Sequence, residues 1–537
     1  MIMKRIFKGF LSFLLCISLV IGTAAVCAPN LNAGDNAPGT DTPLIYLCGT
    51  GDMLVAPGED GTYRKVYGLD IPEDYVQNIV KENIGLFTKA VLTQQWDDFC
   101  DLMYNSIAPL YSEIKLDENG RPTNSSKVNW SWSRDSINAG KINGKYGTTQ
   151  FTFHYDWRLD PLETAEKLHA YIEDVMAVTG AEKVGLLGRC LGSCIVAAYM
   201  QKYDAQYIKD LIVYTSAING VAPITACFSG DLYLDADGLN RLVYDTPLSG
   251  DTVINQLIDA FVTVANATYG LDLACWSVNN VWPELKLKIM PRILRDAYAS
   301  WPSYWAMVGD EGYEEAKKTV FYGADAGKYE NFIDIIDNYH YNVQQKVPEL
   351  FKDYEARGID IYNVSKYGFQ DYPIRRNSSK LSDSVCDLDA QSAEATTAPL
   401  GTTLDDSYIT AAGSNGTAKY ISPDRSVDAS TCLFPDRTWF IKNLKHADFP
   451  DIVNRLFDLM INEDDFDVSS SDKYPQYLVF DRTDGVESIS PMTADNMNTD
   501  ERYKTSFFDA LVNLIRSIVR LIIRALSPVK TGSSAAM

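Results

Sequence analysis

The sequence predicts an α/β protein in which helices cover a mostly parallel β-sheet. Three observations lead to this prediction. Short apolar stretches typical of buried strands recur along the first half of the chain, stretches of helical period separate them, and glycine or proline marks many of the turns. Strands that alternate with helices pair in parallel, because each helix carries the chain back across the sheet. At 537 residues, the chain is long enough for one large domain with insertions or for two or three domains.

The predicted elements of this sheet follow one another between residues 42 and 220. The first strand runs into a glycine-rich turn, and the helix that starts after Pro161 has an apolar face and a glycine stop at Gly180. In chain order we expect strands and helices as follows: a strand at 42–52, a strand at 146–161, a helix at 162–180, a strand at 182–188, a helix at 191–203 and a strand at 209–220.

Beyond residue 228 the pattern changes and then returns. The middle of the chain is helical and rich in aromatic residues such as Trp301, Tyr304 and Trp305, whose helical spacing indicates packing inside a cap, with the lining of an apolar substrate groove as the alternative for some of them. Within it, 358–368 is typical of a strand that returns to the sheet, and 376–404 is typical of a mobile loop. We therefore predict five parts: a signal peptide (1–33), the first part of the core (34–228), a helical cap insertion (229–404), the second part of the core (405–470) and a C-terminal extension (471–537).

The N-terminus has the pattern of a secretory signal. Lys4, Arg5 and Lys8 precede an apolar run from Phe10 to Val26, and small residues follow. Cleavage after Ala33 would give a secreted or extracytoplasmic protein. An uncleaved anchor helix is the alternative.

Charge and cysteine content exclude some classes of function. The formal net charge is −23 at pH 7, and the body of the chain between its basic N-terminal segment and its basic C-terminal segment is strongly acidic without a basic patch, so a nucleic-acid partner is not expected. Ten cysteines are widely spaced, without a CxxC pair or a Cys/His cluster, so we expect neither a metal nor a complete disulfide framework. Cys190 and Cys194 lie one helical turn apart, a separation too large for a disulfide.

The segment KVGLLGRCLGSC, at 183–194, is the strongest local signal for chemistry. Its centre, Gly188-Arg189-Cys190-Leu191-Gly192, is a G-x-S-x-G elbow with cysteine in the serine position. A nucleophile held in a strained turn between strand and helix needs neighbours nearly free of side chain at ±2. The N-terminus of the following helix favours a thiolate, and Arg189 adds a neighbouring cation.

A nucleophile of this kind needs a histidine and an acid. Elbows of this type belong to α/β hydrolases, in which the chain order is nucleophile, acid, histidine. Of the four histidines, only His340 and His446 follow Cys190, and His446 comes just after a strand-like segment, TWFIKNL. His154 and His169 are expected to be structural.

The acid is expected between that elbow and His446. Asp424 follows KYISP, which is typical of a strand end, and is favoured over Asp428, which has a capping role as its other interpretation. The oxyanion hole would take the backbone amide of Leu191 and a second amide from the loop after the first strand, at Thr50 or Gly51.

These segments together resemble a known family. The combination of IYLCGTGD (45–52), FHYDWRLDP (153–161), EKVGLLGRCLGS (182–193), a large insertion, and an Asp and a His in that order resembles the lecithin:cholesterol acyltransferase-like branch of the α/β hydrolases, which includes lysosomal phospholipase and bacterial relatives. The Y-D-W-R at 155–158 is the most specific match. The resemblance covers roughly 42–228 and 405–463.

The resemblance implies an α/β-hydrolase fold with a helical cap and a Cys190, Asp424, His446 triad. It further implies acyl transfer from a lipid or other ester to water or an alcohol, without a metal or organic cofactor. Two departures are present: cysteine replaces serine, and the acid site reads D-R-S-V-D where the family has D-G-T-V-P. A secreted binding protein that has kept the fold and lost catalysis is the alternative function.

The C-terminal segment 506–527 predicts a basic amphipathic helix. Its polar residues form one narrow stripe, comprising Asp509, Asn513, Arg516, Arg520 and Arg524, and nearly all the others are apolar. Three arginines disfavour a simple bilayer crossing. We therefore expect the helix to lie in an anionic membrane interface, with docking on an apolar protein surface as the alternative.

Overall fold

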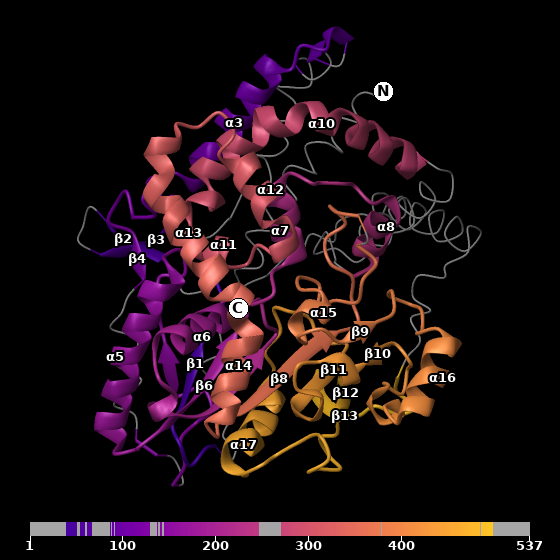
Figure 1. The fold of residues 1–537 in the computed structure, drawn as a ribbon. Coiled ribbons are helices and arrows are strands. Elements are labelled where there is room, and N and C mark those ends of the chain that lie inside the picture. Colours follow the sequence, from indigo (N-terminus) through magenta and orange to yellow (C-terminus); the bar gives the residue numbers. More distant parts are fainter. Residues whose placement is uncertain are drawn as a thin grey trace, which may run out of the picture.

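An eight-stranded β-sheet forms the centre of the computed structural model (Figure 1). The structure describes residues 39–497 except 51–53, 59–61, 67–85, 87–88, 91, 129–136, 138–139, 142–143, 246–269, 377 and 484. The neighbours in the sheet pair in parallel except for its last two strands, which pair antiparallel. In spatial order the strands are β13 (Val486–Pro491), β12 (Tyr477–Thr483), β11 (Thr438–Lys442), β8 (Asp360–Tyr367), β7 (Ile208–Tyr214), β6 (Val184–Arg189), β1 (Leu44–Leu47) and β5 (Phe151–Phe153). The predicted α/β class, with a mostly parallel sheet, is confirmed.

Helices cover the central strands on both faces. Every residue of β6 is buried, as in a parallel sheet covered on both sides. Leu186 packs in the core that includes α5 (Pro161–Thr179) and α6 (Leu191–Lys202), whereas its neighbour Leu187 packs in a second core with α17 (Asn454–Asn462). The alternating side chains of one strand therefore join two separate hydrophobic layers.

The helix α5 shows why the sequence signals at its ends were informative. Asp160 accepts a hydrogen bond from the Leu162 amide at its start, Pro161 occupies its first turn, and Gly180 ends it with a left-handed φ of 70°. The predicted helix at 162–180 is thus confirmed to within a residue.

A group of helices lies above the sheet in Figure 1. Trp301, Tyr304 and Trp305 are all buried in this group, as their helical spacing predicted. Trp301 meets Trp157 edge to face, with 5.1 Å between the ring centroids, so the helices above the sheet pack directly on the segment that follows β5. The helices are α3 (Asp97–Tyr111), α7 (Ala222–Ser229), α8 (Ala236–Asp245), α10 (Gly270–Asp296), α11 (Pro302–Trp305), α12 (Asp310–Val320) and α13 (Glu330–Asn342).

The remaining described elements are shorter or peripheral. The helix α14 packs on α6, and two small sheets have the strand orders β3-β2-β4 and β10-β9. Their bounds are β2 (Leu54–Pro57), β3 (Tyr63–Lys65), β4 (Lys127–Val128), α14 (Val347–Ala356), α15 (Leu388–Gln391), β9 (Thr396–Thr397), α16 (Asp406–Asn415) and β10 (Val427–Asp428).

Some strands of the sheet lie outside the two ranges predicted for the core, 34–228 and 405–470. β8 lies inside the range 229–404 expected for the cap and confirms the strand predicted at 358–368, since it returns to the sheet and pairs with β7 and β11. β12 and β13 extend the sheet beyond residue 470. The segment 376–404, expected to be a mobile loop, contains α15 and β9, and several of its polar side chains are buried.

Two predicted segments lie outside the described residues: the signal peptide at 1–33 and the amphipathic helix at 506–527. Within the described part of the chain, no helix combines the length and apolar character needed to span a bilayer.

Candidate active site

Cys190 occupies a sharp turn between β6 and α6. Its backbone has φ 50° and ψ −122°, a conformation that non-glycine residues rarely adopt. The Cys190 amide donates to the Tyr214 carbonyl at the end of β7, 3.1 Å away, and α6 begins at the next residue. The side chain is only 1% exposed. The predicted strand, strained turn and helix are therefore confirmed.

Glycines on each side of Cys190 allow this close packing. A Cβ on Gly188 would lie 2.9 Å from the Ser193 Cα, and one on Gly192 would lie 2.9 Å from the Cys48 carbonyl oxygen. A Cβ on Gly49 would lie 2.9 Å from the Cys190 Cβ and 3.4 Å from its Sγ. The loop after β1 therefore passes directly against the candidate nucleophile.

This contact bears on the expected oxyanion hole. Leu191 is the first residue of α6, so its amide belongs to the helix N-terminus, where backbone N–H groups lack intrahelical acceptors. Thr50 is buried in the loop after β1, and Gly51 lies outside the described residues. The loop thus meets the elbow as expected, and Leu191 and Thr50 are the described candidates for the two amides.

His446 follows β11 and is held by Asp383 through two contacts. Its Nδ1 lies 2.7 Å from the Asp383 Oδ2, and its backbone amide donates to the Asp383 carbonyl, also at 2.7 Å. The Nε2 atom of the ring is buried and has no partner that meets hydrogen-bond geometry, although the Cys386 thiol also interacts with the His446 ring. This is the arrangement of an oriented general base, with one nitrogen fixed by a carboxylate and the other directed elsewhere.

Charges around His446 favour its protonated form. Burial acts to lower the pKa of His446, but the Asp383 carboxylate, together with Cys190 and Cys386, raises that pKa well above its usual value. Burial acts to raise the pKa of Asp383, but the charges of His446 and Lys366 and two hydrogen bonds hold it below its ordinary value. Cys190 thus interacts electrostatically with the imidazole that Asp383 orients.

The expected pairing of Asp424 with His446 is wrong. Asp424 Oδ2 instead accepts from the Lys442 Nζ at 2.8 Å, and its Oδ1 accepts from the hydroxyls of Ser422 and Ser426. Burial acts to raise the pKa of Asp424, but Lys442 and these hydrogen bonds lower it below its ordinary value. The strand expected before it is absent from this stretch, which has a 3₁₀ turn at Ala418–Tyr420 and only the two-residue β10.

The alternative acid, Asp428, is also occupied elsewhere. Its Oδ1 accepts from the Ser430 amide and its Oδ2 accepts from the Tyr408 hydroxyl, each at 2.8 Å. This confirms the capping interpretation of Asp428. Asp383 is therefore the acid that the structure brings to His446.

Sequence reasoning missed Asp383 although one signal pointed to it. Asp383 lies between Cys190 and His446, so it satisfies the order nucleophile, acid, histidine, and it follows the strand at 358–368. Fourteen residues lie between Gly368 and Asp383, and the segment 376–404 has the composition of a loop, so no strand end marks this acid in the sequence. The carboxylate is fixed there by the amides of Val385 and Cys386, which donate to its Oδ1 at 3.1 and 2.8 Å.

The other histidines have structural surroundings. His340 lies on α13, where its Nδ1 is 2.7 Å from the Gln344 Oε1 and its ring stacks on Tyr313. His169 stacks on Tyr203, with 4.0 Å between the ring centroids. The contacts of His169 agree with the structural role expected for it, and those of His340 show that it packs on Gln344 and Tyr313.

The Y-D-W-R segment builds the scaffold beside the site. Arg158 is fully buried and donates to both oxygens of Asp156, at 2.9 and 2.7 Å, and to main-chain oxygens of Ile114 and Ser126. The Tyr155 hydroxyl donates to the Cys48 carbonyl at 2.5 Å. This segment therefore anchors the loop that passes over Cys190.

One group of described side chains has the spacing to hold a metal ion: Asp383, Cys386 and His446, whose ligand atoms all lie within 4.8 Å of one another. Its chemistry favours another interpretation. The Asp383–His446 hydrogen bond accounts for two of the three groups, burial raises the pKa of the Cys386 thiol, and the cation Lys366 acts on Asp383. We interpret the group as an oriented histidine with a neutral thiol beside it. The eight cysteines in the described residues are all free and buried.

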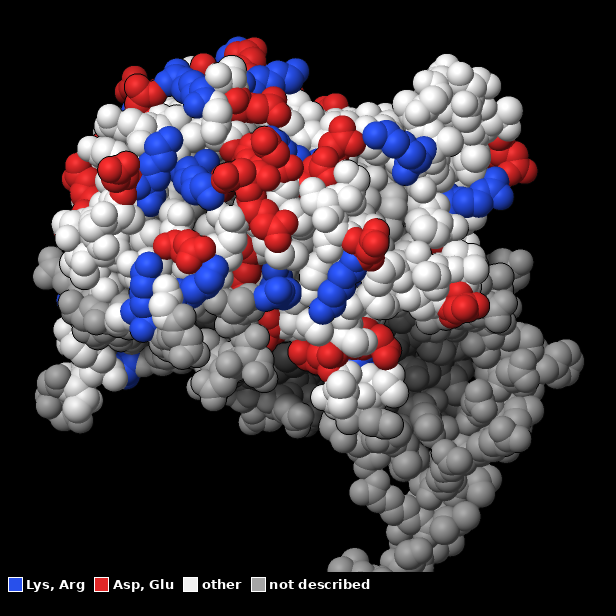
Figure 2. All heavy atoms as spheres, turned by 90° about the horizontal axis from the view of Figure 1, so that it is seen from below, with Lys and Arg blue, Asp and Glu red and all other residues white. Residues whose placement is uncertain are grey.

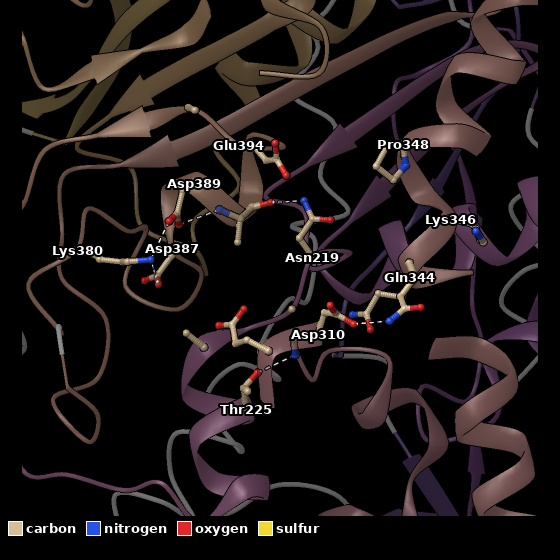
Figure 3. A pocket seen from close by; sticks show the side chains of 17 residues that line it. Asn219, Thr225, Asp310, Gln344, Lys346, Pro348, Lys380, Asp387, Asp389 and Glu394 are labelled. Atoms are coloured by element: carbon tan, nitrogen blue, oxygen red, sulfur yellow. Dashed lines mark hydrogen bonds and ion pairs between the residues drawn. The ribbon is translucent and has the colours of Figure 1, made fainter. Parts of the chain in front are cut away.

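A polar pocket of about 780 Å³ is lined in part by Asp387 and Asp389, which follow Asp383 in the chain (Figure 3). On one side are Asp387 and Asp389, both in contact with Lys380, and on the other is Asp310 at the start of α12. Asp387 follows Cys386 in the chain. The residues that line the pocket do not include Cys190 or His446. The acidic side chains of this pocket thus border the segment that carries Asp383.

The surface seen in Figure 2 carries both signs of charge. Lysine and arginine side chains lie among aspartate and glutamate side chains on this face, without a continuous basic area among the described residues.

Comparison with models of known protein families finds no match, and no curated protein sequence matches the chain. The structure by itself defines the class as an α/β protein with a large, mostly parallel sheet flanked by helices.

Proposed function

We propose that the chain is a thiol-dependent acyl-ester hydrolase or acyltransferase of α/β-hydrolase type, with Cys190 as nucleophile, His446 as base and Asp383 as the orienting acid. One observation carries the proposal: the imidazole of His446 is fixed by Asp383 at 2.7 Å through Nδ1, while its buried Nε2 has no partner that meets hydrogen-bond geometry. A cysteine in a strained elbow at a helix N-terminus is the group that such a base would activate.

The proposed reaction has two acyl-transfer steps. His446 Nε2 takes the thiol proton, and the Cys190 thiolate attacks the ester carbonyl carbon, which gives a tetrahedral oxyanion. The backbone amides of Leu191 and Thr50 are the candidates to bind that oxyanion. The intermediate collapses to a thioester as the alcohol leaves with the proton from His446. Water or a second alcohol then attacks the thioester, His446 takes its proton, and the thiol is restored as the acid or new ester departs.

The substrate class rests on the sequence. The resemblance to the lecithin:cholesterol acyltransferase-like branch favours a lipid-like ester, and the chemistry above needs neither metal nor organic cofactor. We propose an extracytoplasmic location from the predicted signal at 1–33. We also propose that the amphipathic segment 506–527 holds the enzyme at a membrane surface.

One observation favours a second function, that of a secreted binding protein without catalysis. Cysteine stands where the family has serine, and its side chain is 1% exposed. The oriented His446 and the glycines around the elbow would then be inherited features. The two functions differ in whether Cys190 reacts in the folded protein.

Covalent labelling separates them. The full chain is incubated with a short-chain thioester and with iodoacetamide, and intact mass and peptide mapping locate the adduct. We expect an acyl adduct on Cys190 that is lost with time in water, and alkylation of Cys190 faster than that of the same thiol in the urea-unfolded chain. Cys190→Ala should abolish both, whereas Cys227→Ala, which removes another buried thiol, should abolish neither. Alkylation of folded Cys190 no faster than in the unfolded chain would refute the catalytic proposal.

A further inference from the structure

Two fully buried cations lie under the segment that carries His446. Lys366, on β8, donates through Nζ to the main-chain oxygens of Lys445, His446 and Asp448, at 2.7, 2.9 and 3.0 Å. Arg189, the last residue of β6, donates through Nη2 to the main-chain oxygens of His446 and Ala447, at 2.7 and 3.0 Å. All five hydrogen bonds thus end on the carbonyl oxygens of residues 445–448.

These cations reach the segment from the two strands that flank β7. β6 and β8 each pair with β7, whose last residue is Tyr214. The Lys366 Nζ lies 4.9 Å and the Arg189 Cζ 6.0 Å from the centre of the Tyr214 ring, and Arg189 also lies over Phe449 at 5.3 Å. The sheet therefore presents two positive charges to one loop, at the strand ends where Cys190 and His446 lie.

Hydrogen bonds from cations are stronger than neutral ones, and a loop held by five of them has little freedom to move. The segment is also joined to Asp383 through the His446 amide. The orientation of the imidazole is consequently set from three sides: by Asp383, by Lys366 and by Arg189.

Around His446, buried positive charges outnumber buried carboxylates. The charged and titratable groups around the site include Asp383 and Cys386, which act on His446, Lys366, which acts on Asp383, Arg189 and Asp448, which act on Tyr214, and Cys194, which interacts with Cys190. Against the two buried cations, Asp383 is the one carboxylate among them that is fully buried. A site with this excess of positive charge favours an ionised Asp383 and an anion, thiolate or oxyanion, at the elbow.

We propose that Lys366 and Arg189 are positioning residues of the candidate active site, which fix the 445–448 segment, and with it the position of the His446 imidazole, and which bring buried positive charge to the site. The inference rests on the proposed function for the identity of the reacting group, Cys190. It adds two residues that do not touch the substrate and act through His446 and Asp383.

The test follows the alkylation of Cys190 by iodoacetamide from pH 4.5 to 9 in the full chain. Lys366→Met is the principal variant. The matched control is Lys209→Met, because the Lys209 Nζ also donates to a main-chain oxygen, that of Ile461 at 2.7 Å, near the opposite end of β7. For Lys366→Met we expect the pH of half-maximal alkylation to rise by about one unit and the rate at pH 7 to fall about tenfold, the usual effect of removing a neighbouring opposite charge. Lys209→Met should retain the wild-type profile.

Arg189→Gln gives a second, independent measurement if Lys366→Met does not fold. We expect the same upward movement of the profile, whereas a residue with only a structural role would lower the urea midpoint and leave the profile unchanged. Profiles that match wild type in the folded variants would overturn the inference. Failure of the proposed function is seen separately, in wild-type Cys190 that reacts no faster than an unfolded thiol.

Discussion

The substitutions Asp383→Asn and Asp424→Asn each replace one carboxylate by an amide. Together they test which of these two residues is the acid that acts on His446. In Asp383→Asn the new Oδ1 can still accept from the amides of Val385 and Cys386, so the local turn is kept. The new Nδ2 faces the His446 Nδ1 and donates to it. His446 then carries its proton on Nε2, which is the wrong tautomer for a base that must take the Cys190 proton.

We expect Asp383→Asn to lower the reactivity of Cys190 and Asp424→Asn to lower the stability of the fold. The Asp-to-Asn change in serine triads costs about 10⁴ in turnover, and because a thiol is already partly ionised near pH 7 we expect a smaller loss in Asp383→Asn, about 10²–10³ in alkylation and acylation rates. Asp424→Asn removes the charge that balances the buried Lys442. Breaking such a pair costs about 3 kcal/mol in the free energy of unfolding, and the reactivity of Cys190 should be unchanged.

The assay measures two quantities for each variant: the rate of Cys190 alkylation at pH 7 and the urea midpoint followed by fluorescence. Asp383→Asn should lose reactivity at a nearly wild-type midpoint, and Asp424→Asn should lose stability at a wild-type rate. The reverse result, with reactivity lost in Asp424→Asn and kept in Asp383→Asn, would refute the assignment of the acid.

Two further predictions follow from single positions. Burial raises the pKa of Asp210 to about 7, so between about pH 4 and 7 the folded chain binds this proton more tightly than the unfolded chain. The free energy of unfolding therefore falls as pH rises through that window, by at most about 4 kcal/mol. Asp210→Asn should remove this loss, which urea midpoints at pH 5 and 8 can measure; an equal pH dependence in the variant would contradict it. Gly49→Ala places a Cβ 2.9 Å from that of Cys190 and should slow alkylation at least about tenfold by crowding the thiol. Gly413→Ala, where a new Cβ meets nothing within 4 Å, should not; equal rates in both would show that the loop does not constrain the thiol.

The sequence predicted those features that depend on a few adjacent residues. The elbow at Cys190 needs a strand, two glycines and a helix within about twenty residues, and each of these has its own local signal. His446 could be found for a similar reason, because it follows a recognisable strand and only two histidines lie downstream of the elbow. The α5 helix carried signals at both ends, in Asp160 and Gly180.

The acid could not be found in this way because its position depends on contacts between distant segments. Asp383 reaches His446 across 63 residues of sequence, from a segment without the periodicity of a strand or a helix. What orders that segment is a set of hydrogen bonds, such as those from Gln391 to the main-chain oxygens of Lys366 and Cys386. Side-chain amides that bond to distant main chain leave no pattern in the sequence. The strand expected before Asp424 was wrong for a different reason. The few apolar residues of this segment suit a strand, but in the described structure the segment does not pair along the edge of a sheet.

The two buried cations give a physical reason why a cysteine suits this elbow. A serine triad rests with a neutral hydroxyl and a neutral imidazole, so the buried Lys366 and Arg189 would have no anion at the elbow to stabilise. A thiol can lose its proton near neutral pH, whereas a serine hydroxyl cannot. When the Cys190 thiol gives its proton to His446, the net charge of the site stays the same, but the thiolate places a negative charge at the elbow, where the two buried cations stabilise it. The same positive charge would stabilise the oxyanion of the tetrahedral intermediate, so the cost of burying Lys366 and Arg189 is offset both at rest and during the proposed reaction.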